Sequence, residues 1–343
     1  MIDEFISCDW GTSSLRLRLV CLPTLEVLGE TRSDDGAARV QTAILKSFDA
    51  RDDVDARTLA QARAKRYEEL LEAQLAALTN KVGRELQGQP IVVSGMATST
   101  IGWRELPYGS LPLELHAAEI PVHHGSPIGA GTHPLLLISG LRDEADVLRG
   151  EEAEILGILQ APDYEHIHSS AVLVLPGTHS KHVRIKSGAI THFRTFMTGE
   201  LFEVMACHSI LRNSVTPETL RGRWWETDSA LGEGFSEGVS LGAREPLSGS
   251  FFSVRARQVL EAKSGDWCAA YLSGILIGSE LASATANATT TTTPVLVSAS
   301  GDLRDLYHLG CSTLKLDEHI QFATPEVMDI AVARGQSLFL SRF

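Results

Sequence analysis

EFISCDWGTSSLRLRLV (residues 4–20) decides the fold, because its plan occurs a second time in the chain. An apolar run leads into the Gly, Thr and Ser cluster DWGTSS, and LRLRLV then alternates apolar and polar residues, as a strand with one buried face does. SAVLVLPGTHSKHVRIKSGAITHFRTF (residues 170–196) has the same order of apolar strand, small-residue loop and alternating strand, followed by a turn at KSG and a third strand. The recurrence predicts two similarly built halves with a boundary near residues 163–169.

The segments around these two runs have the periodicities of helices and buried strands. Apolar residues in residues 57–80 recur at the spacing of one helical face, whereas PIVVSG (90–95) and PLLLISG (134–140) are short apolar runs that end at small residues. The other predictions are a strand over 25–33, helices over 143–160, 198–211 and 266–284, a Thr-rich surface loop over 286–294, a strand over 295–301 and an amphipathic helix over 325–340. Strands that alternate with helices indicate an α/β protein.

Length and composition bound the class of protein. The chain has 343 residues, of which 43% are hydrophobic, so it exceeds one ordinary domain and favours two. Asp and Glu outnumber Lys and Arg by 43 to 30, and the formal net charge of -13 repels nucleic acids and anionic membranes. A small soluble partner is therefore expected.

The cysteines, histidines and N-terminus indicate a cytoplasmic protein without a structural metal. The five Cys form no CxxC pair, so neither a disulfide framework nor a zinc site is expected. Structural or solvent-facing roles are favoured for four histidines that lack an HxxxH spacing: His179, His182, His192 and His208. MIDEFISCDW lacks the basic start and apolar core of a signal peptide, and no apolar run approaches membrane-spanning length. The sequon at Asn287 is accordingly interpreted as chance.

The two small-residue loops are candidate phosphate sites. Gly lets the backbone approach a ligand, and successive N–H groups can surround an anion. Asp9 ends its strand, where its carboxylate could hold Mg²⁺ directly or through water, and Lys181 could meet a phosphate or lie in solvent. Each loop alone could equally be a tight turn, but the matched pair favours a nucleotide. Neither GxxxxGK[ST] nor GxGxxG occurs, and GEGFSEG (232–238) has the wrong spacing, so the two commonest nucleotide motifs are excluded.

Two further segments could carry chemistry. RGEEAEILG (149–157) places Arg149, Glu151 and Glu152 at the front of an apolar helix, where a carboxylate could accept the proton of an attacking hydroxyl. A solvated Glu pair that caps the helix is the alternative. SGMATSTIGWRELPYG (94–109) follows a strand, where open α/β sheets bind small ligands, although it could instead be an irregular packed loop.

Seven stretches together carry a resemblance to a known family. In chain order they are DWGTSSLR, SGMATSTIGW, VLRGEEAEILG, LPGTHSKHV, FRTFMTGEL, YLSGILIGSEL and VSASG, and they span nearly the whole sequence. In this combination the chain resembles the 2-dehydro-3-deoxygalactonokinases, also called 2-keto-3-deoxygalactonate kinases, of the actin/hexokinase/Hsp70 ATPase superfamily. Ser14 and Ser180 depart from the Asn and Cys that are common in relatives, and both keep a small polar side chain.

The resemblance implies a fold and a reaction. The fold would be two RNase H-like α/β domains that flank a nucleotide cleft: residues 1–165 with the sugar-acid pocket, and residues 166–343 with the nucleotide site and a terminal helix that packs back on the first domain. The reaction would be phosphotransfer from ATP with Mg²⁺ to the 6-hydroxyl of 2-dehydro-3-deoxy-D-galactonate, in galactonate catabolism. Catalysis of this kind depends mainly on positioning and charge neutralisation. The resemblance also suggests a homodimer.

The resemblance also implies roles for individual residues. The catalytic group would be Asp9, which would also hold Mg²⁺, with Arg149 as a charge partner and either Glu151 or Glu152 as the base. The nucleotide would contact Gly11, Thr12, Ser13, Ser14, Gly177, Thr178, His179, Ser180, Lys181, Ser300 and Gly301. The sugar acid would contact Gly95, Met96, Ser99, Trp103 and Tyr108. The sequence chooses neither between the two Glu nor between the C4 epimers of the substrate.

Two alternatives stay open at this point. RGEEAEIL also resembles the exopolyphosphatase signature of the same superfamily, in which a Glu orients the attacking water. Such a phosphohydrolase would release phosphate without a sugar acid, and the loop over 94–109 would have no obvious use. A non-catalytic, actin-like nucleotide-binding module would tolerate replacement of either Glu, and it is less favoured because the sequence has no recognisable DNA-binding or membrane-binding segment.

Overall fold

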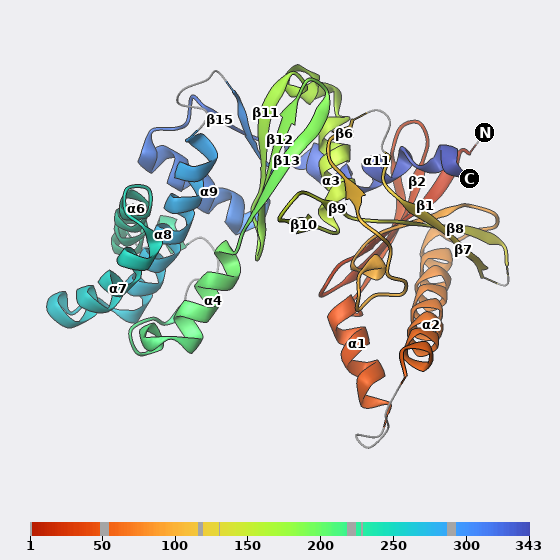
Figure 1. Cartoon of the computed structure of the whole chain (residues 1–343), viewed down its shortest axis with the longest axis horizontal. Helices are drawn as coiled ribbons and strands as arrows, with labels where there is room; N and C mark the ends of the chain where they lie inside the picture. The colour runs from red at the N-terminus through yellow and green to blue at the C-terminus, as the bar shows by residue number, and fades with distance from the viewer. Residues whose placement is uncertain are drawn as a thin grey trace. The chain divides into compact units, whose positions relative to one another are not determined.

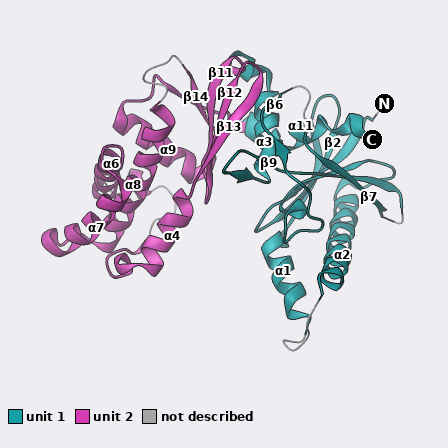
Figure 2. Ribbon diagram, in the orientation of Figure 1, with its two compact units in different colours: residues 1–166, 326–343 teal, residues 167–325 magenta. Residues whose placement is uncertain are grey.

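The computed structural model describes residues 2–48, 55–115, 119–129, 131–217, 224–227, 229–286 and 293–343 (Figure 1). The chain divides into two compact units: unit 1 comprises Met1–His166 and Glu326–Phe343, and unit 2 comprises Ile167–Pro325 (Figure 2). Each unit has its own sheet and its own hydrophobic core. Most of the predicted Thr-rich loop and the Asn287 sequon lie outside the described residues.

Unit 1 is built on a mixed sheet in the strand order β3-β2-β1-β4-β8-β7. β1, β2 and β3 are consecutive antiparallel strands, β4 and β8 run parallel to β1, and β7 returns antiparallel to β8. The strands are Glu4–Trp10 (β1), Leu15–Cys21 (β2), Val27–Ser33 (β3), Ile91–Gly95 (β4), Val122–Ile128 (β7) and His133–Ile138 (β8). The predicted hairpin, third strand and two buried strands are confirmed.

Two helices, α1 (Ala37–Lys46) and α2 (Ala56–Val82), pack against this sheet (Figure 1). The Asp55 side chain begins α2 by accepting a hydrogen bond from Thr58 N, and Gly83 ends it in the left-handed conformation. The buried face of α2 consists of Tyr67, Leu71, Leu75 and Leu78. Because these side chains recur at three- and four-residue spacings, the helix predicted over 57–80 is confirmed with its apolar face inward.

Unit 2 repeats the plan of unit 1. Its strands lie in the order β15-β14-β11-β12-β13, with β11, β12 and β13 antiparallel in succession and β14 and β15 parallel to β11. Ser187 and Gly188, in the KSG turn, have φ of 53° and 77°, as two-residue hairpin turns require. The strands are Ser170–Leu175 (β11), Ser180–Lys186 (β12), Ala189–Phe196 (β13), Val295–Val297 (β14) and Ile320–Phe322 (β15). The predicted recurrence and the α/β fold class with two RNase H-like sheets are confirmed.

Glycines let two helices of unit 2 approach closely. These are α6 (Ser229–Gly242) and α8 (Gly265–Thr285). A Cβ at Gly238 would lie 2.2 Å from Tyr271 O, and one at Gly242 would lie 1.9 Å from Ile275 O. The glycine run GEGFSEG is therefore a helix-packing surface. The remaining helices of unit 2 are α4 (Thr198–His208), α5 (Trp224–Thr227), α7 (Leu247–Glu261) and α9 (Gly301–Leu314).

The helix predicted over 143–160 is wrong in its first half. α3 spans only Glu151–Leu159, because Gly150 has φ 114°, which lies outside the helical region. Val147–Leu148 instead form a short strand, β10, which pairs with β9 (Leu141–Arg142). Val147 is exposed and Leu148 is buried, so the pair alternates as strand residues do. Two adjacent apolar residues fit both the helical and the strand period, so only the strand that pairs with them decides which structure forms.

The helix predicted over 325–340 is two helices, α10 (Pro325–Asp329) and α11 (Ala331–Ser337), interrupted at Ile330. Within unit 1, α11 packs on α3 at backbone distance, since a Cβ at Gly157 would lie 1.7 Å from Ala331 O. The break at Ile330 turns α11 so that it packs closely on α3 at Gly157. The remaining short elements are β5 (Gly109–Ser110), β6 (Leu113–Glu114) and 3₁₀ turns at Met96–Thr98, Pro162–Ile167, Ile210–Asn213 and Leu340–Arg342.

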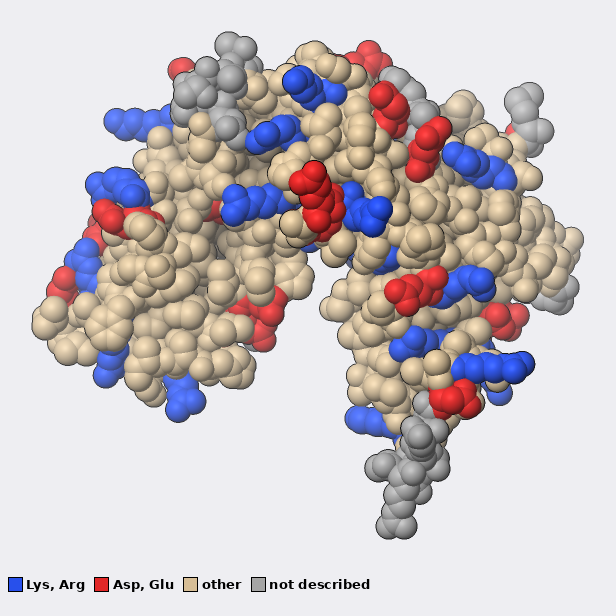
Figure 3. Space-filling view, in the orientation of Figure 1, with Lys and Arg blue, Asp and Glu red and all other residues tan. Residues whose placement is uncertain are grey.

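The charged side chains are mixed on the surface. On the face shown in Figure 3, Lys and Arg lie among Asp and Glu, so the net charge of -13 is not gathered there in one acidic region. Among the described helices, none has the length and apolar character needed to cross a membrane.

Candidate functional site

The loop between β1 and β2 is a tight turn joined to the start of α1. Gly11 N donates to Ser14 O over 2.9 Å, which closes the turn. The carbonyl oxygens of Gly11 and Thr12 accept hydrogen bonds from Ala37 N (3.0 Å) and Ala38 N (3.1 Å) at the start of α1. The three hydroxyl residues of the loop, Thr12, Ser13 and Ser14, are exposed. The two carbonyls are thus engaged, while hydroxyl donors remain at the surface where a phosphate could accept from them.

The loop between β11 and β12 is joined to α4 in the same way. The carbonyl oxygens of Gly177 and Thr178 accept hydrogen bonds from Gly199 N (3.3 Å) and Glu200 N (3.1 Å) at the start of α4. This turn is closed by a side chain, because Gly177 N donates to the Oγ of the buried Ser180 over 3.1 Å. Both loops are therefore tight turns with matched helix support, and phosphate binding to them stays a prediction.

Two side chains of the second loop are already engaged within it. His179 Nε2 pairs with the carboxylate of Glu200. Lys181 is only 5% exposed, and its Nζ donates to His179 O over 3.1 Å. A solvent-facing strand lysine, one of the two readings that the sequence allowed, is therefore wrong. The ammonium group instead adds a positive charge beside the loop backbone.

Asp9 carries the carboxylate next to the first loop. It lies opposite Arg16 in β2 and beside Ser94 in β4. Asp9 Oδ2 accepts a hydrogen bond from Arg16 Nη2 over 3.0 Å, whereas Oδ1 has no hydrogen-bond partner within the part of the chain that the structure describes. The Asp9 side chain is 30% exposed. One carboxylate oxygen thus remains available to a cation or to water.

The groups around Asp9 fit a magnesium ion whose other ligands are phosphate oxygens and waters. Across the described residues, no group of three or more His, Cys, Asp or Glu side chains is arranged to hold a metal. Mg²⁺ needs no such cage, because in nucleotide sites it usually keeps several waters and binds one or two carboxylates together with substrate phosphates. The available Oδ1 of Asp9 meets that requirement.

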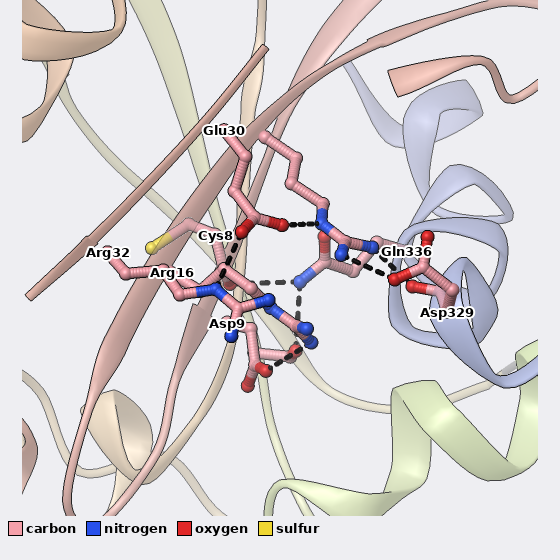
Figure 4. A network of polar contacts seen from close by, with 9 residues as sticks. Cys8, Asp9, Arg16, Glu30, Arg32, Asp329 and Gln336 are labelled. Carbon is pink, nitrogen blue, oxygen red and sulfur yellow. Dashed lines mark hydrogen bonds and ion pairs between the residues drawn. The ribbon is translucent and has the colours of Figure 1, made fainter. Parts of the chain in front are cut away.

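A buried glutamine holds the strands on either side of Asp9. Gln336 of α11 donates from Nε2 to Cys8 O and to Ser94 Oγ, both over 2.9 Å, and is 0% exposed (Figure 4). Cys8 directly precedes Asp9, and Ser94 lies beside it in β4. Sequence reasoning missed Gln336, because it lies 328 positions from Cys8. Its only local signal is a polar side chain in a helix of small residues.

Arg18 makes a second tie between the C-terminal segment and the sheet of unit 1. This residue is 5% exposed, and its Nε donates to Glu30 Oε2 over 2.5 Å. Its Nη2 donates to Asp329 Oδ1 over 2.7 Å, and its Nη1 donates to Asp329 O. Through these contacts the Arg18 side chain connects α10 to β2 and β3. The sequence showed Arg18 only as one polar position in the alternating strand.

The two glutamates at the start of α3 have different surroundings. Glu152 is 0% exposed; its Oε2 accepts a hydrogen bond from Gly150 N over 2.6 Å, and its Oε1 has no partner among the described atoms. Burial raises the pKa of Glu152 from an ordinary 4.5 to about 8. Glu151 is only partly buried and accepts a hydrogen bond from Arg149 N over 3.1 Å. The solvated, helix-capping pair is therefore wrong for Glu152, since that carboxyl group lies in the protein interior.

Arg149 holds the loop that follows β4. Its Nη1 donates to Thr98 O (2.5 Å) and Thr98 Oγ1 (2.7 Å), and its Nη2 donates to Leu106 O over 3.0 Å. The guanidinium group also lies 4.1 Å from the centre of the Tyr108 ring, within the range of a cation–π contact. With these donors engaged, the contacts favour a positioning role for Arg149 over a direct charge partner of the transferred phosphoryl group.

The residues predicted to contact the sugar acid divide into packed and accessible ones. Gly95 and Ser99 are buried, and Ser99 Oγ donates to Met96 O over 2.7 Å. Trp103 stacks on Tyr67 of the core at 6.0 Å between ring centres, yet it is only partly buried. Met96 and Tyr108 are also partly buried. The loop is thus packed, as the alternative interpretation proposed, but three of its five predicted contact residues still reach the surface.

An apolar cavity of about 220 Å³ adjoins the second loop within unit 2. Leu303 and Leu306 of α9 contribute to it, and the predicted adenosine-side residues Ser300 and Gly301 lie at the N-terminus of the same helix. The described lining residues are Gly177, Thr198, Gly199, Phe202, Trp224, Ser273, Leu276, Ile277, Leu303, Leu306 and Tyr307. An apolar slot that opens beside a glycine loop suits a ligand with a flat apolar end and an anionic end.

A fully partnered buried glutamate lies beside this cavity. Glu280 of α8 is 1% exposed. Its Oε1 lies 3.1 Å from His182 Nε2, and its Oε2 accepts hydrogen bonds from Tyr307 OH (2.8 Å) and from Thr198 Oγ1. Burial raises the pKa of Tyr307 well above its usual range, so the phenol stays a donor. Sequence reasoning gave Glu280 no role, although the motif YLSGILIGSEL contains it.

Comparisons with known proteins agree on one family. The model of the 2-keto-3-deoxy-galactonokinase family matches residues 9–328. A Rhizobium meliloti protein named as a probable 2-dehydro-3-deoxygalactonokinase is 33% identical over 310 residues, which are 88% of this chain and 87% of that protein. The 2-dehydro-3-deoxygalactonokinase of Escherichia coli is 32% identical over 199 residues, 57% of this chain and 61% of that protein. A crystal structure of a Sinorhizobium meliloti protein, named as a putative 2-dehydro-3-deoxygalactonokinase, superposes with a TM-score of 0.76 at 30% identity over 99% of both chains.

Proposed function

The chain belongs to the 2-keto-3-deoxy-galactonokinase family, and we propose that it transfers the γ-phosphoryl group of ATP to the 6-hydroxyl of 2-dehydro-3-deoxy-D-galactonate. The observation that carries this proposal is the family match over residues 9–328, which includes both glycine loops and the α3 glutamates. The enzyme class is a sugar-acid kinase, a phosphotransferase with an alcohol acceptor. The family match favours this activity over a phosphohydrolase and over a non-catalytic nucleotide-binding module.

ATP binding is assigned to unit 2. The apolar cavity beside Gly177 would take the adenine end, with Ser300 and Gly301 at the adenosine side. The loop from Gly177 to Ser180 would take phosphate oxygens through backbone N–H groups and the Thr178 hydroxyl. Lys181 would act mainly through its field, because its side chain is only 5% exposed and its ammonium group donates to His179 O.

In unit 1, Asp9 and the first loop are assigned to the transferred phosphoryl group. Asp9 Oδ1 would hold Mg²⁺, which supplies charge neutralisation at the phosphates when bound. Arg16 orients the carboxylate through its 3.0 Å contact with Oδ2. The exposed hydroxyls of Thr12, Ser13 and Ser14 would donate to phosphate oxygens.

Glu151 is assigned as the general base for the 6-hydroxyl. A base must reach the proton that it removes, and Glu151 is only partly buried. Glu152 is fully buried, and its raised pKa of about 8 keeps it protonated at neutral pH, so it does not serve as the acceptor. The positive φ of Gly150 turns the chain so that the two adjacent glutamates begin α3.

The sugar acid is assigned to the loop that Arg149 holds, with Met96, Trp103 and Tyr108 as its partly exposed contact residues. Because the guanidinium binds two carbonyls and a hydroxyl of this loop, it would set the loop shape before substrate arrives. A homodimer in the cytoplasm is part of the proposal. Sedimentation of the purified protein tests the dimer, and fractionation of the cells that produce it tests the location.

The test of the activity is a coupled assay of ADP release with ATP and Mg²⁺. We expect turnover that depends on 2-dehydro-3-deoxygalactonate and exceeds that with the gluconate epimer and with simple hexoses. Phosphate release without a sugar acid would instead support the phosphohydrolase. An absence of sugar-acid-dependent turnover in folded protein would overturn the proposal.

A further inference from the structure

A second cavity in unit 2, of about 120 Å³, is lined by basic side chains. It lies between the strands β12 and β13 and the last turns of α8. Its polar lining consists of His182, Arg184, His192, Arg194 and Ser283. It shares no described lining residue with the apolar cavity beside Gly177, and no step of the proposed reaction uses it.

The strand register places these basic residues in two facing pairs. Arg184 of β12 lies opposite His192 of β13, and His182 lies opposite Arg194. Side chains of residues directly opposite on one face of an antiparallel pair are about 4.5–5.5 Å apart at Cβ, and the two arginines are diagonal neighbours at about 7–8 Å. Like charges at these positions repel weakly, because Arg184, His192 and Arg194 are exposed to solvent, and a bound anion would relieve this repulsion.

The described residues around the cavity supply little negative charge. Of the lining residues that the structure describes, none is Asp or Glu. Neither guanidinium, of Arg184 or of Arg194, donates a hydrogen bond or forms an ion pair within the described ranges. The carboxylate of Glu280 contacts the lining residue His182, and its oxygens are already engaged by His182, Tyr307 and Thr198. The C-terminal turn of α8 favours cations through its dipole but supplies only partial charges.

The cavity is fixed on the side of His182 and Phe196, whereas Arg184, His192 and Arg194 are exposed. The His182 ring stacks on Phe196 at 4.2 Å between ring centres, and the Arg194 guanidinium lies 5.3 Å from the centre of the same ring. His182 is 8% exposed and is held by Glu280. Side chains that are fixed before a ligand arrives lose less entropy when it binds.

We propose that this cavity binds a small phosphate-type dianion, either inorganic phosphate or the phosphate group of a monoester. Planar guanidinium groups match the oxygens of phosphate in a bidentate manner, and the charges of two arginines can neutralise two negative charges. A volume of about 120 Å³ accommodates such a group with some water but not a nucleotide. The site goes beyond the proposed kinase activity, since it requires neither ATP nor the sugar acid.

The test is a titration of the whole protein, labelled with ¹⁵N-histidine, with inorganic phosphate and separately with methyl phosphate. The imidazole signals of His182 and His192, assigned through His182→Gln and His192→Gln, should shift in a saturable manner. If only one of the two ligands saturates the signals, that ligand identifies the site as one for the free ion or for the ester. Saturation with either ligand supports the site. Signals that do not move to saturation with either ligand overturn it.

The variants make the test specific. Arg184→Gln with Arg194→Gln should weaken the binding at least tenfold, whereas Arg184→Lys with Arg194→Lys should keep part of it. The matched control is Arg212→Gln, an exposed arginine of unit 2 away from the cavity, which should bind like wild type. Unchanged binding in the double glutamine variant would contradict the proposal. Kinase turnover, measured in parallel, should persist in that variant, so failure of the anion site and failure of the kinase assignment give different results.

Discussion

The loops after β1 and β11 are joined to a helix by matching hydrogen bonds but carry different side chains. In both, a glycine and a threonine carbonyl accept hydrogen bonds from the first amides of a helix. Two residues before the glycine, however, unit 1 has Asp9 and unit 2 has Leu175, which is 6% exposed. The two loops share the support of a tight turn by the first amides of a helix. Only the loop of unit 1 follows a strand with a carboxylate near its end.

The buried glutamates of the two units differ in a similar way. Glu280 in unit 2 has three partners, His182, Thr198 and Tyr307. Glu152 in unit 1 is equally buried, but its Oε1 has no partner among the described atoms. A buried polar atom without a hydrogen bond costs stability, so Glu152 lowers the stability of unit 1, whereas Glu280 cross-links a packed core.

The largest effect is expected for Asp9→Asn, which removes the carboxylate that only the first loop has beside it. Loss of the proposed metal ligand should lower kcat by about 10³-fold or more, because phosphoryl transfer depends on charge neutralisation. Steady-state kinetics and a thermal melt check this, and the melt should stay close to that of wild type. The matched control, Asp34→Asn in the exposed segment before α1, should keep full activity. Wild-type turnover in Asp9→Asn would mean that the loops do not differ in function.

The next effect concerns the two adjacent glutamates of α3. Glu151→Gln should lower kcat by about 10²- to 10⁴-fold, since general-base catalysis contributes about that much, and should leave the KM for ATP nearly unchanged. Glu154→Gln, in the same first turn of α3, is the control and should lose less than about twofold. If Glu152→Gln were inactive and Glu151→Gln active, the assignment of the base would be reversed.

A smaller effect is expected in the pH dependence of stability. Between about pH 4.5 and pH 8 the folded protein keeps a proton on Glu152 that the unfolded chain has released. The contribution of this group to the free energy of unfolding therefore falls as the pH rises, by up to about 1.4 kcal/mol per pH unit. Urea unfolding at several pH values should show a flatter dependence for Glu152→Gln than for wild type. Parallel curves for the two proteins would show that Glu152 titrates normally.

The smallest effect compares how the two turns are closed. Ser180 Oγ accepts the hydrogen bond from Gly177 N, whereas in the first loop the backbone of Ser14 does so. Ser180→Ala should lower the free energy of unfolding by about 1 kcal/mol, and Ser14→Ala should leave it unchanged, because the latter keeps its carbonyl. Paired thermal melts measure the difference. Equal losses would show that the two turns are closed by the same kind of contact.

Much of the fold follows from local patterns. The two strand-loop-strand runs, the helix over Ala56–Val82 and the buried strand Ile91–Gly95 carry periods that depend only on neighbours in sequence, and these predictions were right. The helix predicted at Val147–Leu148 was wrong. Two apolar residues fit a helix or a strand equally, and their pairing with Leu141–Arg142 makes them a strand. The break at Ile330 was also missed, because it depends on the packing of α11 on α3, a segment far away in the sequence.

For the site, the sequence by itself determined which chemical groups are present: a strand-ending Asp9, two adjacent glutamates, two small-residue loops and the family to which they belong. Only the tertiary structure decided which groups are exposed and what they contact. It buried Glu152 and Lys181, engaged Arg149 with a loop about 50 residues away, and brought Gln336 to Cys8 across 328 positions. The physical reason is that residue type and spacing encode local geometry, whereas burial, pKa and hydrogen-bond partners depend on segments that meet only in the folded chain.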